Sequence, residues 1–228
     1  MKAIVYVDGY NFYYGCLKHS TDKWLDIYKL FSQFILKAQC PQLTDVIIKF
    51  FTAPIHAKVA THGQQAQIAQ QNYQRALTTL YPQQVQIISG YYSLEKAKLL
   101  AYKQPPDKND RLEVWKLEEK QTDVNIALTA YRDAIKGLAD IFVFVSNDTD
   151  LEPALSAIRQ EIGQTIEIGI VIPLRQPEPH APKRPPNQRL SKYANWTRDY
   201  LTHDELANSH LPSKIPTSKK TIFKPDYW

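Results

Sequence analysis

The sequence has few of the residues that disulfide-rich folds and structural metal sites need. Only two of its 228 residues are cysteine, Cys16 and Cys40, and no C-x-x-C or Cys/His cluster is present. Neither a disulfide framework nor a structural zinc site is therefore indicated. No apolar run approaches the roughly 18 residues that a membrane span needs, and the run before Asp8 is too short for a signal peptide. We expect a cytoplasmic protein without membrane contact.

The excess of positive charge is small and lies at one end of the chain. Residues 1–182 carry 19 basic and 19 acidic side chains, whereas residues 183–228 carry nine basic and four acidic ones. A neutral body with a basic, proline-containing C-terminal segment suits an anionic partner such as a nucleic acid. A solvated segment without a partner is the alternative that charge alone leaves open.

Short apolar runs alternate with amphipathic stretches over the first 175 residues. The apolar runs predict strands at residues 2–7, 46–51, 85–89, 141–145 and 165–172. The stretches between them predict helices at residues 11–18, 26–38, 64–80, 122–136 and 150–162. Strands that alternate with helices form a parallel sheet with helices on both faces. We therefore predict an α/β domain over residues 1–175, with a mainly parallel sheet of about five strands.

Three segments do not follow this alternation. Residues 90–117 flank a turn cluster at 105–110 and predict an inserted β-hairpin arm. The basic residues of this arm would contact a nucleic-acid backbone, or the arm would join two copies of the chain in a homodimer. Residues 176–211 are predicted to form a Pro-rich basic extension with a short helix near 192–201. Residues 212–228 are predicted to be a flexible tail.

Acidic residues stand where two of the predicted strands end. Asp8 directly follows the first strand, and Asp148 comes three residues after the fourth. In doubly wound sheets, ligands bind beyond the carboxyl ends of the strands, where the strand order reverses. If these two strands are neighbours there, Asp8 and Asp148 face one another. Asp123, at the start of the helix before the fourth strand, can join them, and Asp150 lies close by.

Such a group of carboxylates favours a particular chemistry. Without a cation, converging carboxylates repel one another and some take up protons. Mg²⁺ or Mn²⁺ suits an all-oxygen site, lowers the pKa of bound water and neutralises charge on a phosphoryl group. We therefore predict phosphodiester hydrolysis by metal-activated water. The predicted catalytic metal ligands are Asp8, Asp123, Asp148 and Asp150. Each also has a structural alternative, because Asp is common in turns and at helix N-caps.

Three short blocks of the sequence carry these acids. They are Val7-Asp8-Gly9-Tyr10-Asn11, the segment EEKQTDVNIA at residues 118–127, and the segment VSNDTDL at residues 145–151. In order, spacing and strand context they resemble the signatures of NYN-domain proteins, most of all the LabA-like branch of the PIN-like nucleases, over residues 1–175. The resemblance implies a Rossmann-like PIN fold, metal-dependent ribonuclease activity, and Asp8, Asp123 and Asp148 as metal-binding acids with Asp150 as a fourth.

Several neighbours of these acids have predicted supporting roles. Asn11 matches the motif's asparagine and would orient Asp8 or hold a metal-bound water, and Ser146 resembles the small hydroxyl residue of the last block. Lys120 would contact the scissile phosphate or balance the acids. Gln121 stands where glycine is usual, and it would alter the turn before Asp123 if that turn needs a positive φ.

Aromatic residues crowd beside Asp8, where one exposed ring would stack on a base of single-stranded RNA; packing in the core is the alternative. These residues are Tyr10, Phe12, Tyr13 and Tyr14. Two other functions stay open. Asp148-Thr149-Asp150 after a hydrophobic strand also suits a haloacid-dehalogenase-like phosphatase, although that family places its Asp-x-Asp on an early strand. The fold is also compatible with an RNA-binding or scaffold protein without turnover.

Overall fold

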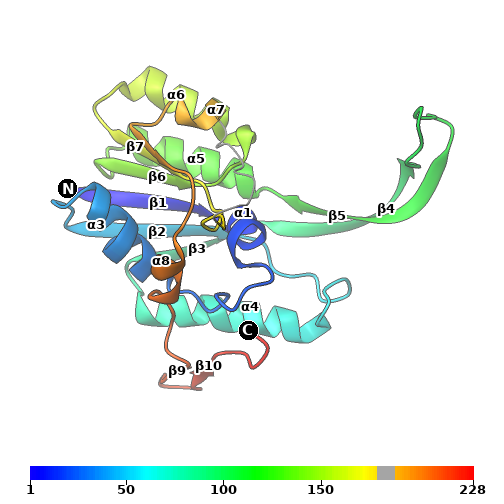
Figure 1. The fold of residues 1–228 in the computed structure, drawn as a ribbon, viewed down its shortest axis with the longest axis horizontal. Coiled ribbons are helices and arrows are strands. Elements are labelled where there is room, and N and C mark those ends of the chain that lie inside the picture. The colour runs from blue at the N-terminus through cyan, green and yellow to red at the C-terminus, as the bar shows by residue number, and fades with distance from the viewer. Residues whose placement is uncertain (179–187) are drawn as a thin grey trace.

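The computed structural model describes residues 1–178 and 188–228. Its centre is a six-stranded sheet with the strand order β3-β2-β1-β6-β7-β8, in which every neighbouring pair is parallel (Figure 1). The strands are β1 (Lys2–Asp8), β2 (Asp45–Thr52), β3 (Val85–Ser89), β6 (Ile141–Val145), β7 (Glu167–Val171) and β8 (Trp196–Arg198). The predicted α/β class and parallel sheet are confirmed.

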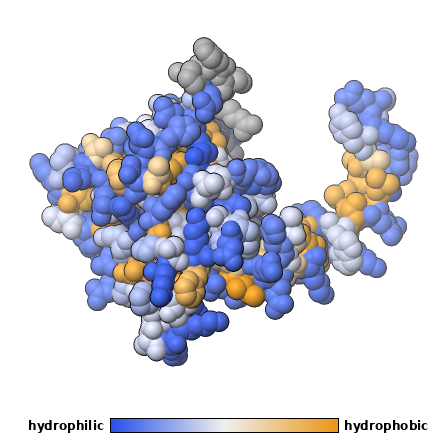
Figure 2. Space-filling view, turned by 60° about the horizontal axis from the view of Figure 1, so that its bottom comes forward, coloured by the Kyte–Doolittle hydropathy of each residue, from blue (hydrophilic) through white to orange (hydrophobic). Residues whose placement is uncertain are grey.

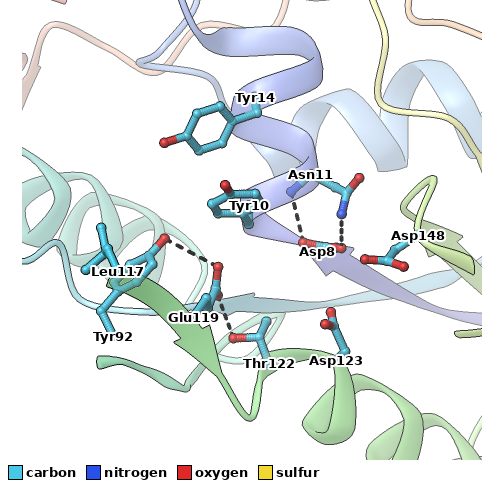
Figure 3. Close-up of a pocket in the computed structure, with 10 residues that line it drawn as sticks. All are labelled: Asp8, Tyr10, Asn11, Tyr14, Tyr92, Leu117, Glu119, Thr122, Asp123 and Asp148. Carbon is cyan, nitrogen blue, oxygen red and sulfur yellow. Dashed lines mark hydrogen bonds between the residues drawn. The ribbon is translucent and has the colours of Figure 1, made fainter. Parts of the chain in front are cut away.

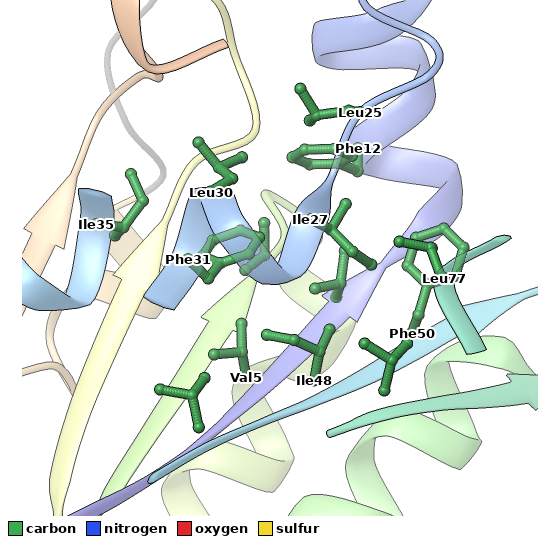
Figure 4. Packing of buried hydrophobic residues seen from close by; sticks show 14 of the residues in the cluster. Val5, Phe12, Leu25, Ile27, Leu30, Phe31, Ile35, Ile48, Phe50 and Leu77 are labelled. Atoms are coloured by element: carbon green, nitrogen blue, oxygen red, sulfur yellow. The ribbon is translucent and has the colours of Figure 1, made fainter. Parts of the chain in front are cut away.

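Two hydrophobic layers cover the sheet, because alternate residues of each strand point to opposite faces. On β1, Val5 and Val7 belong to one cluster, while Ile4 and Tyr6 belong to the other. Figure 4 shows Val5 in the first cluster below Phe31. The helices of that layer are α1 (Gly9–Phe12), the π-helical η1 (Tyr13–Leu17), α2 (Ile27–Lys29), the π-helical η2 (Leu30–Ile35), α3 (Leu36–Gln39), α4 (Gly63–Leu80) and α8 (His203–Ala207).

The second layer lies on the other face of the sheet. It is built by α5 (Thr122–Ile135), the 3₁₀ turn η3 (Thr149–Leu151), α6 (Glu152–Ile162) and α7 (Gln188–Ser191). Strands covered on both faces are apolar along their whole length, and all five residues of β6 are buried. Among the described residues, no helix has the length and apolar character needed to cross a bilayer.

The predicted hairpin arm is present and leaves the body of the molecule (Figure 1). It consists of β4 (Tyr91–Leu100) and β5 (Arg111–Lys120), which pair antiparallel over their full length. Apolar side chains on it are exposed, Trp115 at 65% and Leu112 at 57%, and apolar surface marks the arm in Figure 2. The base of the arm connects to β3 through Gly90 and to α5 through Gln121.

The chain after β7 differs from the prediction in two places. The short helix expected near 192–201 is instead the edge strand β8, while α7 ends before it. Gly169 on β7 makes room for this strand, because a Cβ there would lie 2.2 Å from Cζ2 of Trp196. The Pro-rich stretch of residues 179–187 lies outside the described residues.

The segment predicted as a flexible tail has a defined course in the structure. It forms the two-stranded ribbon of β9 (Lys214–Ile215) and β10 (Ile222–Phe223) and then runs along α4. The Trp228 ring lies against Trp24 and Tyr73, with centroids 6.1 and 5.9 Å apart, and Trp24 Nε1 donates a hydrogen bond to the Pro212 carbonyl at 2.9 Å. Aromatic burial of this kind supplies the docking energy.

Asp22 ties the N-terminal helices to two later segments. Its buried carboxylate accepts hydrogen bonds from Arg175 at 2.6 Å and from His210 at 2.7 Å. Although burial raises the pKa of Asp22, these two partners outweigh burial and hold the pKa below its ordinary value of 3.8. A depressed carboxyl pKa stabilises the fold at higher pH, and that stability is lost as the pH falls through the folded pKa.

We therefore expect Asp22→Asn to lower the free energy of unfolding by about 1–2 kcal/mol at neutral pH. The difference from wild type should shrink as the pH falls below 3.8. Urea denaturation at a series of pH values measures this, with Asp107→Asn in the exposed arm loop as the control. A difference that stays constant at all pH values would contradict the assigned role of the Asp22 charge.

Candidate functional site: an acidic pocket at the sheet switch point

The strand order reverses between β1 and β6, which lie side by side. From β1 the chain proceeds through β2 and β3 to one edge of the sheet, and from β6 it proceeds through β7 and β8 to the other. A pocket of about 220 Å³ opens at the carboxyl ends of these strands. It is lined by four acids: Asp8, Glu119, Asp123 and Asp148 (Figure 3).

Asp8 is held in place by hydrogen bonds from both sides of the switch point. Its Oδ2 accepts from Asn11 Nδ2 at 2.7 Å and from Ser146 Oγ at 2.8 Å, and its Oδ1 accepts from the Asn11 amide at 3.0 Å. Ser146 Oγ in turn accepts from the Asp148 amide at 3.0 Å. Asn11 and Ser146 thus fix the position of Asp8, and Ser146 links it to the loop that carries Asp148.

Both acids at the strand ends also cap helices. Asp8 is the N-cap of α1, and the carboxylate of Asp148 accepts from the Asp150 amide at 2.9 Å at the start of η3. Asp8 and Asp148 thus have the helix-capping role that the sequence left open, and both also line the pocket. Gly9 permits the sharp entry into α1, since a Cβ at this position would lie 2.5 Å from the Phe51 carbonyl oxygen.

The acids influence one another's protonation. Burial, followed by the charges of Asp8 and Asp148, raises the pKa of Asp123 from 3.8 to about 6. Burial also raises the pKa of Asp8, although hydrogen bonds from Asn11 and Ser146 oppose this effect. Burial likewise raises the pKa of Glu119, whose Oε1 accepts from Thr122 at 2.6 Å. Negative charge in this pocket is therefore unfavourable without a counter-charge.

The donor set of the pocket matches a hard divalent cation in chemistry, because it offers only oxygen ligands. The described pocket lining includes no Lys, Arg or His to balance the acids. As the side chains are placed, however, no group of three or more His, Cys, Asp or Glu among the described residues surrounds a common point that could hold a metal ion. Asp8, Asp123 and Asp148 would need to turn toward one another to share one ion.

The structure places the other predicted residues differently. Asp150 is exposed and does not line the pocket. Lys120 points away from the pocket and pairs with Glu118, because neighbouring residues on β5 alternate between its faces. Asn11 lines the pocket and Ser146 donates a hydrogen bond to Asp8, and their roles in the site stay predictions. Sequence reasoning missed Glu119 as a pocket acid, because its place depends on how the arm joins the body.

The turn before Asp123 does adopt a positive φ. Gln121 is the N-cap of α5 with φ 72° and ψ −14°, which is the left-handed region. For a residue with a Cβ, this conformation costs roughly 1–2 kcal/mol. The family-typical glycine would remove that cost, so Gln121 stores strain directly beside the site.

We expect Gln121→Gly to raise the free energy of unfolding by about 0.5–1 kcal/mol, because the relief of strain exceeds the added entropy of the unfolded chain. Gln65→Gly, inside the first turns of the regular helix α4, is the matched control and should lower stability by up to about 1 kcal/mol. Chemical denaturation of both variants measures the difference. A loss of stability in both would argue against strain at Gln121.

Comparison with known proteins places the chain in a family. The model of the NYN-domain family matches residues 2–185. A relative named 6-hydroxy-3-succinoylpyridine 3-monooxygenase HspA, from Pseudomonas putida (strain DSM 28022 / S16), is 39% identical over 244 aligned positions, which cover 100% of this chain and 75% of that protein. The crystal structure of VPA0982, a protein of unknown function from Vibrio parahaemolyticus RIMD 2210633, is 18% identical with a TM-score of 0.47, covering 92% of this chain and 96% of that one. The chain thus belongs to the NYN-domain family and, with it, to the PIN-like superfamily.

Proposed function

We propose that the protein is a metal-dependent nuclease that hydrolyses phosphodiester bonds of single-stranded RNA. One observation carries the proposal: Asp8, Asp123 and Asp148, which come from three separate segments, line one pocket at the switch point of a NYN-domain chain. The NYN-domain family is nuclease-like, and PIN-like nuclease domains usually use divalent metals. Mg²⁺ or Mn²⁺ is the proposed cofactor.

The residues of the pocket have two different proposed roles. Asp8, Asp123 and Asp148 would hold the cation, while Asn11 and Ser146 keep the Asp8 carboxylate oriented through the hydrogen bonds described above. When bound, the cation supplies neutralisation of phosphate charge and lowers the pKa of the water it binds. The acids themselves repel a phosphate, and the described lining provides no basic side chain to offset this. Binding of the RNA backbone therefore depends on the cation.

The test is cleavage of a labelled single-stranded RNA with Mg²⁺, with Mn²⁺, and with EDTA. Metal-dependent cleavage that EDTA abolishes is the expected result. Binding of the RNA without cleavage in either metal would favour the non-catalytic RNA-binding alternative. Release of phosphate from small phosphomonoesters, with the RNA intact, would favour the phosphatase.

A monooxygenase acting on a hydroxypyridine is the second candidate. It is favoured by the 39% identity to the Pseudomonas putida relative across the whole of this chain. Such a reaction transfers one oxygen atom of O₂ to the substrate, while two electrons from a reductant and two protons convert the other oxygen atom to water. Substrate-dependent O₂ consumption with NADH and 6-hydroxy-3-succinoylpyridine, together with intact RNA, would select this candidate over the nuclease. The nuclease proposal predicts cleaved RNA and no substrate-dependent O₂ consumption.

A further inference from the structure

The acidic pocket has a second half that the proposed hydrolysis does not use. Tyr10 and Tyr14 form one side of it, with ring centroids 4.4 Å apart and exposed fractions of 43% and 50%. Tyr92 and Leu117, from the base of the arm, form the other side (Figure 3). Large aromatic rings that stay exposed beside a pocket are available to stack on a ligand.

The pairing of the arm strands determines which side chains reach this space. Tyr92 pairs with Glu119, and Leu94 pairs with Leu117, so these side chains share one face of the ribbon. The next residues along each strand, Tyr91 and Glu118, point to the opposite face. The base of the arm is therefore a wall of the pocket, with one selected face turned toward the tyrosines of α1 and η1.

Glu119 lies between the aromatic half and the three aspartates. Its Oε1 accepts from Thr122 at 2.6 Å and its Oε2 accepts from the Tyr92 hydroxyl at 3.3 Å. A carboxylate has about four acceptor positions, so this group can still accept from a ligand. With acids and no described basic side chain in the lining, the pocket favours N–H donors over anionic groups.

We propose that this half of the pocket binds one planar heteroaromatic ring, stacked against Tyr10 and Tyr14, that donates an N–H hydrogen bond to Glu119. The pocket volume of about 220 Å³ is below the roughly 300–1,000 Å³ of pockets for drug-sized ligands, which suits a single ring. The ring is either a nucleobase of RNA or a free 2-pyridone, the lactam form of a 2- or 6-hydroxypyridine. The substituent on this ring would point toward the three aspartates. This orientation rests on the proposed function.

The test measures binding without turnover. The protein is titrated in EDTA with cytidine, with 2-pyridone, and with N-methyl-2-pyridone, which lacks the ring N–H, and affinity is read by ligand-observed NMR. We expect binding of cytidine or 2-pyridone, with Glu119→Gln weakening it about tenfold, as expected for a hydrogen bond to a charged acceptor. N-methyl-2-pyridone should bind wild type about tenfold more weakly than 2-pyridone. Tyr14→Ala should weaken binding by a similar factor through lost stacking.

Two neighbours on the opposite face of the arm are matched controls. Glu118→Gln and Tyr91→Ala should leave the affinities unchanged. Binding of cytidine alone identifies a nucleobase as the ring, and binding of 2-pyridone alone identifies a small hydroxypyridine. Failure of both probes to bind, or equal binding by wild type and Glu119→Gln, would overturn the subsite even if the protein cleaves RNA. Probe binding without RNA cleavage would leave the subsite standing and remove the nuclease proposal.

Discussion

Replacing Asp148 with Asn should reduce metal-dependent RNA cleavage by about 100-fold or more, because the variant loses one of the charges that hold the cation. The replacement removes the charge of Asp148 and keeps its helix-capping role. Asn is as good an N-cap as Asp, so the hydrogen bond from the Asp150 amide that starts η3 is retained. Cleavage rates at saturating Mn²⁺ measure the effect, and thermal unfolding checks that the variant is folded.

Asp204→Asn is the control for this experiment, since Asp204 lies in the first turn of α8, away from the pocket. It should cleave RNA at the wild-type rate. Asp150→Asn tests the remaining predicted ligand, and its exposed position outside the pocket predicts a much smaller loss than Asp148→Asn. Equal rates in wild type and Asp148→Asn would remove Asp148 from the site.

The largest expected effect on stability is at Lys49, a residue of β2 whose side chain pairs with Asp133 of α5. Lys49 Nζ lies 2.6 Å from Asp133 Oδ2, the Tyr6 hydroxyl donates to the same oxygen at 2.8 Å, and the side chains of Lys49 and Asp133 are only 12% and 9% exposed. Lys49→Met would leave the Asp133 charge buried without its cation. We expect the free energy of unfolding to fall by about 3 kcal/mol.

Two comparisons separate this pair from an ordinary surface ion pair. Lys2→Met breaks the exposed pair with Asp45, whose N···O distance is 3.7 Å, and should cost less than about 1 kcal/mol. The double variant Lys49→Met/Asp133→Leu should recover part of the loss, because no unpaired charge remains, although the buried Tyr6 hydroxyl loses its acceptor. Urea denaturation of all three variants measures this. A loss in Lys49→Met no larger than in Lys2→Met would show that the buried pair contributes little.

The sequence was sufficient for five of the six strands of the central sheet and for the expectation that three acids meet at its carboxyl edge. Val85–Ser89 and Ile141–Val145 have the predicted bounds, because strands buried on both faces stand out as short apolar runs. Asp8 ends one such strand and Asp148 follows another, so the general rule for switch points placed them together. The strained turn at Gln121 was also foreseeable, because glycine is usual at this position and Gln121 has a positive φ.

Features that depend on distant contacts were not predictable in the same way. The edge strand β8 exists because Gly169 leaves space for Trp196, two residues that are far apart in the chain. The course of residues 212–228 depends on Trp228 meeting Trp24 and Tyr73. Glu119, rather than Asp150, lines the pocket as its fourth acid because of the way the arm joins the sheet. No local pattern encodes these pairings.

The central claim is that Asp8, Asp123 and Asp148 share one divalent cation. X-ray diffraction from crystals soaked in MnCl₂, recorded above the manganese absorption edge, tests it directly. We expect an anomalous peak in contact with the carboxylates of Asp8, Asp123 and Asp148, and its absence in Asp148→Asn. Crystals that show no manganese at these carboxylates, from protein that cleaves RNA with Mn²⁺ in solution, would contradict it.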